Sequence, residues 1–375
     1  MNFNTLLEIM TQNQASDMFI TAEKEPCIKV NGVLQPMTRN KLTKDQAMQV
    51  VTSIMNDGQR EEFARTHECN FAIESGDLGR FRVSALMQRD CAAMVLRRIQ
   101  TNVPTWQELG LPPILSELVM NKRGLILFVG GTGTGKSTSL ASLIRHRNEN
   151  SSGHIITIED PLEYVHEHLG CIVTQREVGI DTESFEIALK NTLRQAPDVI
   201  LIGEIRSRET MQQAITFAET GHLCLSTLHA NNANQAIDRI LHFFPEEMHP
   251  QLFMDLSLNL RAIVAQQLIR SPDGKGRFPA IEILVNTPRA ADLIRKGEVH
   301  KLKDLMKHSR EQGMQTFDQC LFDLYRAEKI SYEEALRAAD SQNEVRLMIK
   351  LAQEGKDPNA EEANSMALMP EEEQP

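Results

Sequence analysis

A glycine-rich segment directly after an apolar run limits this chain to few folds. Residues 130 to 137 read Gly-Gly-Thr-Gly-Thr-Gly-Lys-Ser, and they follow the apolar run Leu125–Val129 and precede a helix-compatible stretch. This order of strand, turn and helix is that of a P-loop, whose backbone N–H groups close around phosphate groups. In such a loop Lys136 reaches the β- and γ-phosphates and Ser137 supplies an oxygen to Mg²⁺. The segment therefore predicts a site for ATP and Mg²⁺.

The nucleotide is expected to contact the whole loop and the first turn of the following helix, where the helix dipole adds favourable positive charge. These candidate residues are Gly130, Gly131, Thr132, Gly133, Thr134, Gly135, Lys136, Ser137 and Thr138. The alternative is a merely flexible glycine loop, which requires neither a strand before the glycines nor a lysine after them.

Composition and charge narrow the classes of function. The 375 residues include 41% hydrophobic ones, enough to build two ordinary domains. Forty basic residues against 51 acidic ones give a formal charge of −11, which argues against an extended nucleic-acid footprint. We therefore expect no nucleic-acid partner, and a DNA helicase is disfavoured.

The six cysteines form no Cys-x-x-Cys pair, so neither a zinc ribbon nor a disulfide framework is indicated. The N-terminal segment lacks the basic flank and apolar centre of a signal peptide, and no later run approaches the roughly 18 apolar residues that cross a bilayer. These features predict a cytoplasmic protein.

The order of apolar runs predicts an α/β fold with a smaller domain in front. The first hundred residues mix short helical and strand patterns, and Thr101–Pro113 is rich in proline and reads as a linker. Beyond it, apolar runs alternate with helical patterns, as in a RecA-like core with a parallel sheet covered on both faces. The expected parts are an N-terminal α+β domain (1–100), a linker (101–113), a P-loop ATPase core (114–285), a helical C-terminal subdomain (286–354) and a disordered acidic tail (355–375).

Two acidic segments follow strands of the expected sheet. Glu159, Asp160 and Glu163 come after one apolar run, at the strand end where open α/β sheets place ligands. Acids that only cap the next helix, or that are merely solvated, are the alternative. Glu204 directly follows the run Val199–Ile202 and is interpreted as the Walker B acid, which offers its carboxylate to Mg²⁺ or its waters.

Two histidines bracket another apolar strand. His222 and His229 stand at its opposite ends and on opposite faces, so a shared metal site is disfavoured. His229, at the C-terminal end, is the better candidate for a residue that senses phosphate, although an isolated histidine is more often structural.

Taken in order, four motifs resemble the secretion ATPase superfamily: the P-loop, the acidic box Ile158–Glu163, the Walker B strand and the His box Gly221–His229. Further segments look like the PilT/PilU family of type IV pilus retraction ATPases, namely Gly79–Val83, Gln175–Val178, Glu219–His222 and Gly313–Thr316. The resemblance covers about residues 1 to 340.

The resemblance implies a cytoplasmic homohexamer, peripheral at the inner face of the inner membrane, with a PAS-like N-terminal domain and a RecA-like ATPase domain. By the same resemblance, Lys136 and Ser137 match the Walker A ligands and Glu163 the acid that activates water. Glu204 matches the Walker B acid and His229 the phosphate-sensing histidine.

The family also implies arginines that reach the nucleotide from the N-terminal domain. Arg82 and Arg97 are the candidates, and Arg80 and Arg98 in the same strands remain alternatives.

One departure indicates which member of the family is nearer. PilT-type proteins carry an Ala-Ile-Arg-Asn-Leu motif, whereas this chain has Thr287–Lys296, in which only Leu293, Ile294 and Arg295 fit. Together with the acidic extension, this favours a PilU-type accessory motor. Such a motor acts with a PilT-type partner and with a PilC-type platform protein of the inner membrane.

Two rival functions stay open. A pilus assembly or type II secretion ATPase shares the core chemistry, but such proteins usually carry a larger N-terminal part and a Cys-x-x-Cys insert that this chain lacks. A nucleotide-gated scaffold without catalysis is the second rival, although it has no physical need for Glu163.

Overall fold

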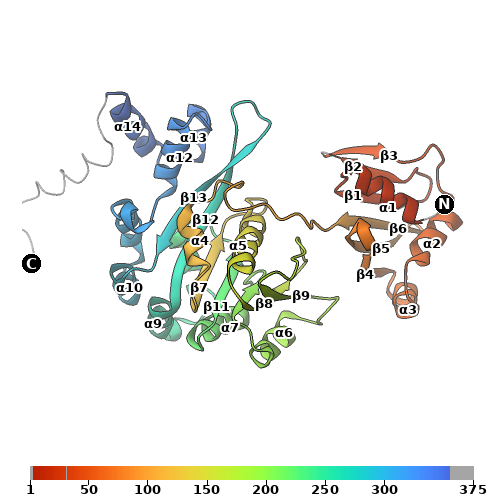
Figure 1. Ribbon diagram of the computed structural model, residues 1–375, viewed down its shortest axis with the longest axis horizontal. Coiled ribbons are helices and arrows are strands. Elements are labelled where there is room, and N and C mark those ends of the chain that lie inside the picture. The colour runs from red at the N-terminus through yellow and green to blue at the C-terminus, as the bar shows by residue number, and fades with distance from the viewer. Residues whose placement is uncertain (1–2, 31, 355–375) are drawn as a thin grey trace, which may run out of the picture. The chain divides into compact units, whose positions relative to one another are not determined.

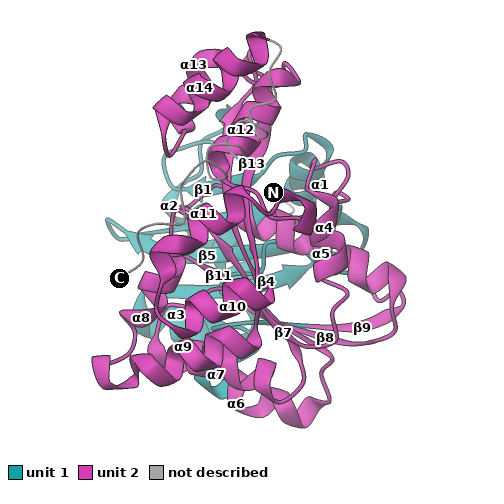
Figure 2. Cartoon of the chain, turned by 90° about the vertical axis from the view of Figure 1, so that its left-hand side faces the viewer, with its two compact units in different colours: residues 1–103, 160–166, 175–187 teal, residues 104–159, 167–174, 188–375 magenta. Residues whose placement is uncertain are grey.

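The computed structural model describes residues 3–30 and 32–354, so the acidic tail expected to be disordered lies outside the described residues. The chain divides into two compact units, shown in Figure 2. Unit 1 comprises residues 1–103, 160–166 and 175–187, and unit 2 comprises residues 104–159, 167–174 and 188–375. The loop that carries Glu163 therefore belongs to unit 1, although its sequence lies between strands of unit 2.

Unit 1 contains a six-stranded antiparallel sheet in the order β3-β2-β1-β6-β5-β4. Its elements are α1 (Phe3–Gln12), β1 (Asp17–Thr21), β2 (Cys27–Val30), β3 (Val33–Pro36), α2 (Lys44–Ser53), α3 (Asp57–Thr66), β4 (Glu68–Glu74), η1 (Gly76–Leu78), β5 (Arg80–Gln88) and β6 (Cys91–Arg98). Thr43 and Asn56 begin α2 and α3 with capping boxes, which satisfy backbone N–H groups that have no partner within the helix. The apolar side chains of α1 and α2 pack with those of the sheet in one core.

A seven-stranded sheet in the order β13-β12-β7-β11-β10-β8-β9 organises the part of the chain that contains residues 130–137. Its elements are α4 (Pro113–Leu118), β7 (Gly124–Val129), α5 (Lys136–Asn150), β8 (Gly153–Glu159), β9 (Cys171–Glu177), α6 (Phe185–Thr192), η2 (Leu193–Gln195), β10 (Val199–Ile202), α7 (Arg208–Glu219), β11 (Leu223–Leu228), α8 (Ala233–Leu241), η3 (Glu246–Met248), α9 (His249–Asn259), β12 (Leu260–Arg270) and β13 (Arg277–Val285).

The central strands β12, β7, β11, β10 and β8 are parallel, and β13 closes one side as an antiparallel strand. The side chains of β7, β10 and β11 are buried throughout, as expected for strands covered on both faces. The crossover from β7 to β8 runs in the opposite direction to the crossover from β10 to β11. Because such connections are right-handed, α5 lies on one face of the sheet and α7 on the other.

The apolar runs that predict parallel strands all form strands of this sheet, and the α/β fold is confirmed. Two further apolar segments, Ala262–Ile269 and Ile281–Val285, lie in the paired antiparallel strands β12 and β13. The chain around Pro245 separates α8 from α9.

Short helices, shown in blue in Figure 1, follow the sheet along the chain and pack on β13, on α9 and on one another. They are α10 (Pro288–Arg295), η4 (Val299–Lys301), α11 (Leu302–Lys307), η5 (Arg310–Gln312), α12 (Phe317–Arg326), α13 (Tyr332–Ala338) and α14 (Gln342–Gln353). Thr287, Thr316, Ser331 and Ser341 cap four of them. Within the described ranges, no helix combines the length and the apolar character needed to span a membrane.

The core of unit 2 offers a direct stability test. Phe128 in β7 is 1% exposed, and the chain's single tryptophan, Trp106, packs against the same core. Phe128→Ala is expected to destabilise this unit by about 3–5 kcal/mol, because it removes a buried ring and leaves a cavity. Urea unfolding followed by Trp106 fluorescence measures the loss. Val33→Ala, at a side chain 61% exposed in unit 1, is the control and leaves the transition unchanged.

Candidate nucleotide-binding site

The P-loop connects the end of β7 to the start of α5, and two of its glycines cannot be replaced without strain. Gly130 has φ +153°, and a Cβ atom there would lie 2.6 Å from the carbonyl oxygen of Gln266 on β12. Gly135 has φ +90°, and its Cβ atom would lie 2.8 Å from Nε2 of the same Gln266. The loop therefore combines left-handed backbone with close packing on β12, which only glycine permits.

Lys136 lies inside this loop. Its side chain is only 9% exposed, and Nζ donates hydrogen bonds to the carbonyl oxygens of Gly130 and Gly131, both at 2.8 Å. Lys136 is also the first residue of α5, so its ammonium group lies at the N-terminal end of the helix, where the helix dipole is positive. Ser137 and Thr138 are partly buried in the same helix turn. This combination suits an anionic group such as a phosphate.

Glu204 and His229, predicted separately from sequence, lie together at the ends of the adjacent strands β10 and β11. His229 Nε2 is 3.0 Å from Glu204 Oε1, and an Arg206 nitrogen is 2.7 Å from Glu204 Oε2. The segment that carries Glu204 is held further by β11, because Thr227 Oγ1 donates a hydrogen bond to the carbonyl oxygen of Gly203 at 2.7 Å. The carboxylate thus lies at the strand ends between two cationic or proton-donating partners.

The donor set fits Mg²⁺ bound with a nucleotide. Among residues 3–30 and 32–354, no group of three or more His, Cys, Asp or Glu side chains could hold a metal ion. Mg²⁺ typically takes one or two protein oxygens together with water and substrate phosphates, rather than an all-protein cage. The hydroxyl of Ser137 and the carboxylate of Glu204 carry oxygen donors of the type that Mg²⁺ takes in such a site.

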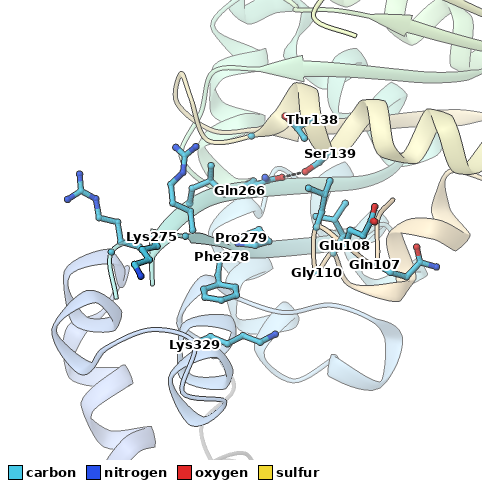
Figure 3. Close-up of a pocket in the computed structure, with 18 residues that line it drawn as sticks. Gln107, Glu108, Gly110, Thr138, Ser139, Gln266, Lys275, Phe278, Pro279 and Lys329 are labelled. Carbon is cyan, nitrogen blue, oxygen red and sulfur yellow. Dashed lines mark hydrogen bonds between the residues drawn. The ribbon is translucent and has the colours of Figure 1, made fainter. Parts of the chain in front are cut away.

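A cavity of about 800 Å³ adjoins the P-loop and is shown in Figure 3. The turn at Gly135 and Thr138 forms one side of it, and the aromatic ring of Phe278 on β13 forms another. Lys329 Nζ lies 5.6 Å from the centre of that ring. The volume of the cavity and its mixture of apolar and polar walls suit a small-molecule ligand. Sequence analysis missed it because its walls come from distant segments.

Three arginines that sequence analysis also missed line a second cavity, of about 520 Å³, with P-loop residues 130, 131, 133 and 134. They are Arg270 on β12, Arg277 on β13 and Arg337 on α13. Arg270 and Arg277 are direct cross-strand partners, an arrangement that is unfavourable for like charges. In the part of the chain that the structure describes, no carboxylate forms an ion pair with either of them. An anion bound beside the P-loop would relieve this repulsion.

Unit 1 holds the other predicted site residues. Arg82, Arg97, Arg98 and Glu163 line one cavity of about 640 Å³, and Glu163 is exposed in its loop. The Arg97 side chain is 70% exposed and donates from Nε to Asp17 Oδ1 at 2.8 Å. The candidate arginines Arg82 and Arg97 and the candidate acid Glu163 thus line the same cavity within unit 1.

Arg82 is held by a buried carboxylate. Its Nε lies 3.6 Å from Oε1 of Glu177, whose side chain is fully buried. Burial raises the pKa of Glu177, and the nearby Arg82 and Arg80 oppose that rise. Arg80 lies 3.8 Å from Asp181 instead. Of the two candidates on β5, Arg82 is the one that lines the cavity with Glu163.

The predicted site residues therefore fall into two groups. Unit 1 contains Arg82, Arg97 and Glu163, and unit 2 contains the P-loop with Glu204 and His229. Each group is assembled within its own unit, from residues that lie far apart in sequence.

A parallel α/β sheet with a P-loop, a strand-end carboxylate and a paired histidine defines a P-loop nucleotide-handling protein. The family described as "Type II/IV secretion system protein" matches residues 2–337. The type IV pilus ATPase PilU of Pseudomonas aeruginosa is 65% identical over 94% of this chain and 93% of its own length. The type IV pilus retraction ATPase PilT of the same species is 40% identical over 90% of this chain and 98% of its own length.

Among solved structures, the pilus retraction motor PilT with bound ADP is similar, with a TM-score of 0.86 and 37% identity. That similarity covers 92% of this chain and 99% of the PilT chain. The chain belongs to the type II/IV secretion system protein family, and within it to the PilT/PilU group of type IV pilus ATPases. The resemblance inferred from the motifs is confirmed.

The contact of the P-loop with Gln266 predicts a sharp difference between two glycines. Gly135→Ala is expected to weaken binding of a fluorescent ADP analogue at least about tenfold, since it combines a left-handed φ with a clash on Gln266. Gly131→Ala is the matched control, because a Cβ atom there has no neighbour closer than 3.9 Å. Equal affinities for the two variants would contradict the steric account.

Proposed function

We propose that this protein uses ATP hydrolysis to drive type IV pilus retraction, as a PilU-type accessory motor that acts with a PilT-type partner. The observation that carries the proposal is the pairing of Glu204 with His229 beside a P-loop that encloses Lys136. The similarity to PilU and PilT over nearly the whole chain supports the pilus system as the place of action.

The site residues fit the needs of phosphoryl transfer, which are charge neutralisation and a positioned water molecule. Mg²⁺, held by Ser137 and Glu204, would neutralise phosphate charge. Lys136 binds the β- and γ-phosphates, and His229, through its contact with Glu204, responds to the terminal phosphate. Glu163 orients the attacking water.

The cavity of about 800 Å³ beside Gly135 and Thr138 suits the nucleoside part of ATP. Phe278 offers an aromatic face for the base, and the leucines at 109, 111 and 268 offer apolar walls. The bound ADP of the similar PilT structure supports a nucleotide as the ligand. Arg270 and Arg277 lie at the border with the P-loop, where the phosphates begin.

The finer assembly belongs to the same proposal. Unit 1 is PAS-like and the ATPase part of unit 2 is RecA-like, and six copies form a ring at the cytoplasmic face of the inner membrane. In that ring Arg82 and Arg97 add positive charge to a nucleotide. The ring acts on a PilC-type platform protein, and no nucleic acid takes part.

The choice of an accessory role rests on α10. Leu293 and Ile294 are buried there, and Arg295 pairs with Asp292 at 2.7 Å, so the three residues that fit the retraction motif occupy a folded helix. The remaining positions of Thr287–Lys296 differ from that motif. We infer that retraction by this protein depends on a PilT-type partner. An assembly or secretion motor remains the alternative function.

Glu163 is expected to act in turnover and not in binding. Glu163→Gln retains a side chain of the same shape and leaves ATP affinity unchanged, but the rate of Mg²⁺-dependent phosphate release falls at least about 100-fold because the water loses its base. Glu167→Gln, at a nearby exposed carboxylate, is the control and keeps full turnover. Normal turnover by Glu163→Gln would remove this residue from the catalytic role.

The direction of transport is tested in a piliated host that also carries a PilT-type protein. Deletion of the gene is expected to leave surface pilin unchanged or increased while twitching motility falls, because pili still assemble but retract poorly. Complementation with wild type restores motility, and Lys136→Ala does not. Loss of surface pili on deletion would instead identify an assembly motor.

A further inference from the structure

Glu282 is a buried carboxylate that the proposed mechanism does not use. It lies on β13 with 1% exposure, between the fully buried side chains of Ile281 and Ile283. A buried ionisable group is costly unless its partners compensate for lost water. The partners of this carboxylate therefore indicate what it does.

One oxygen binds the start of α8. Glu282 Oε1 accepts a hydrogen bond from the backbone N–H of Ala233 at 2.8 Å, and Ala233 is the first residue of that helix. The first N–H groups of a helix have no partner within it, and a negative charge there is favoured by the helix dipole. Asn232 caps the same helix locally by accepting from Gln235 N–H at 2.9 Å. The two acceptors together hold the helix start.

The start of α8 in turn holds the loop that follows β11, residues 229–232, which we call the His-box loop. Asn231 donates its N–H to Gln235 Oε1 at 3.3 Å, and Asn231 lines the cavity that contains the P-loop glycines. Directly before it in the chain comes the segment that carries His229, the partner of Glu204. A shift of the α8 start would therefore move the residues that face the phosphates.

The other side of the carboxyl group faces the C-terminal helices. Oε2 has no hydrogen-bond partner within residues 3–30 and 32–354. The backbone N–H of Phe317, at the start of α12, lowers the pKa of Glu282 and so favours its ionised form. Lys303 on α11 and Asp340 after α13 are the charged groups that act on it, and they pair with each other at 2.7 Å. Asp318 on α12 lies 4.0 Å from the same lysine.

We propose that Glu282 is a positioning residue for the His-box loop, which it holds by binding the start of α8 and which it links to α11, α12 and Asp340. This inference rests on the proposed function, since it concerns how the same site is kept in its working geometry. Glu282 does not contact the P-loop residues and carries no step of the reaction itself.

The charge of Glu282 varies near neutral pH. Burial raises its pKa to about 7, with Asp340 adding to the rise and the N–H of Ala233 and Lys303 opposing it. A charged acceptor makes a shorter and stronger hydrogen bond than a neutral one and matches the positive helix end better. The ionised form therefore fixes the loop more firmly, and turnover is expected to rise as Glu282 loses its proton.

The test compares wild type with Glu282→Gln, which keeps the shape and a neutral acceptor but cannot ionise. The ratio of wild-type to variant kcat is expected to rise at least about threefold from about pH 6 to about pH 8, since charge-assisted hydrogen bonds are roughly twice as strong as neutral ones. KM for ATP changes little, because the P-loop is intact. Groups common to both proteins, His229 included, cancel in this ratio.

Urea unfolding across the same pH range shows whether Glu282 titrates. Its folded pKa lies above the ordinary value of 4.5, so the native state binds the extra proton, and the stability of wild type relative to Glu282→Gln falls as pH rises from 4.5 to about 7. A difference in stability between the two proteins that stays constant with pH would show that Glu282 does not titrate in this range. Glu74→Gln, at an exposed carboxylate on β4, is the matched control and behaves as wild type in both measurements.

A kcat ratio that stays constant with pH, in proteins that are folded and active, would overturn the inference and leave Glu282 as a structural helix cap. Absence of ATPase activity in wild type would instead overturn the proposed function. The two failures are therefore distinguishable in one set of assays.

Discussion

The close packing of the P-loop on Gln266 is the contact on which the site depends. Gln266 lies on β12, where Oε1 accepts a hydrogen bond from Ser139 Oγ at 2.8 Å, while its own backbone and amide nitrogen lie against Gly130 and Gly135. The strand thus supports the loop at its first and its last glycine. Because a close-packed interior has no room for an added methyl group, the loop's shape is set by its neighbour as well as by its glycines.

The sheet brings the remaining chemistry of unit 2 to this loop through strand order alone. β11 is the neighbour of β7, and β10 is the next strand, so Glu204 and His229 emerge at the same edge as the P-loop. On the other side, β12 and β13 deliver Arg270, Arg277 and Glu282. The parallel strands β7, β10, β11 and β12 end at one edge of the sheet, and the antiparallel strand β13 begins at that edge with Arg277, so residues from five strands meet there.

The sequence predicts those parts of the molecule whose signals are local. Apolar runs such as Val199–Ile202 indicate buried strands, and glycine spacing with Lys136 indicates the P-loop, so the α/β fold and the nucleotide site follow from short stretches. Gln266 and Glu282 carry no local signal, because their roles arise only when β12 and β13 pack beside β7 and α8. The placement of Glu163 in unit 1 likewise depends on tertiary contacts.

The paired arginines at the end of the β12–β13 hairpin give that hairpin an unusual dependence on its surroundings. The repulsion between Arg270 and Arg277 opposes the last residue pair of the β12–β13 pairing. This repulsion weakens with added salt, which screens exposed charges over about 10 Å at moderate ionic strength. Phosphate charge beside the P-loop would reduce the repulsion between these two arginines locally and more strongly than dissolved salt does. The end of the β12–β13 hairpin would then be most rigid when a nucleotide is bound. Occupancy of the nucleotide site would thereby change the rigidity of a strand pair outside that site.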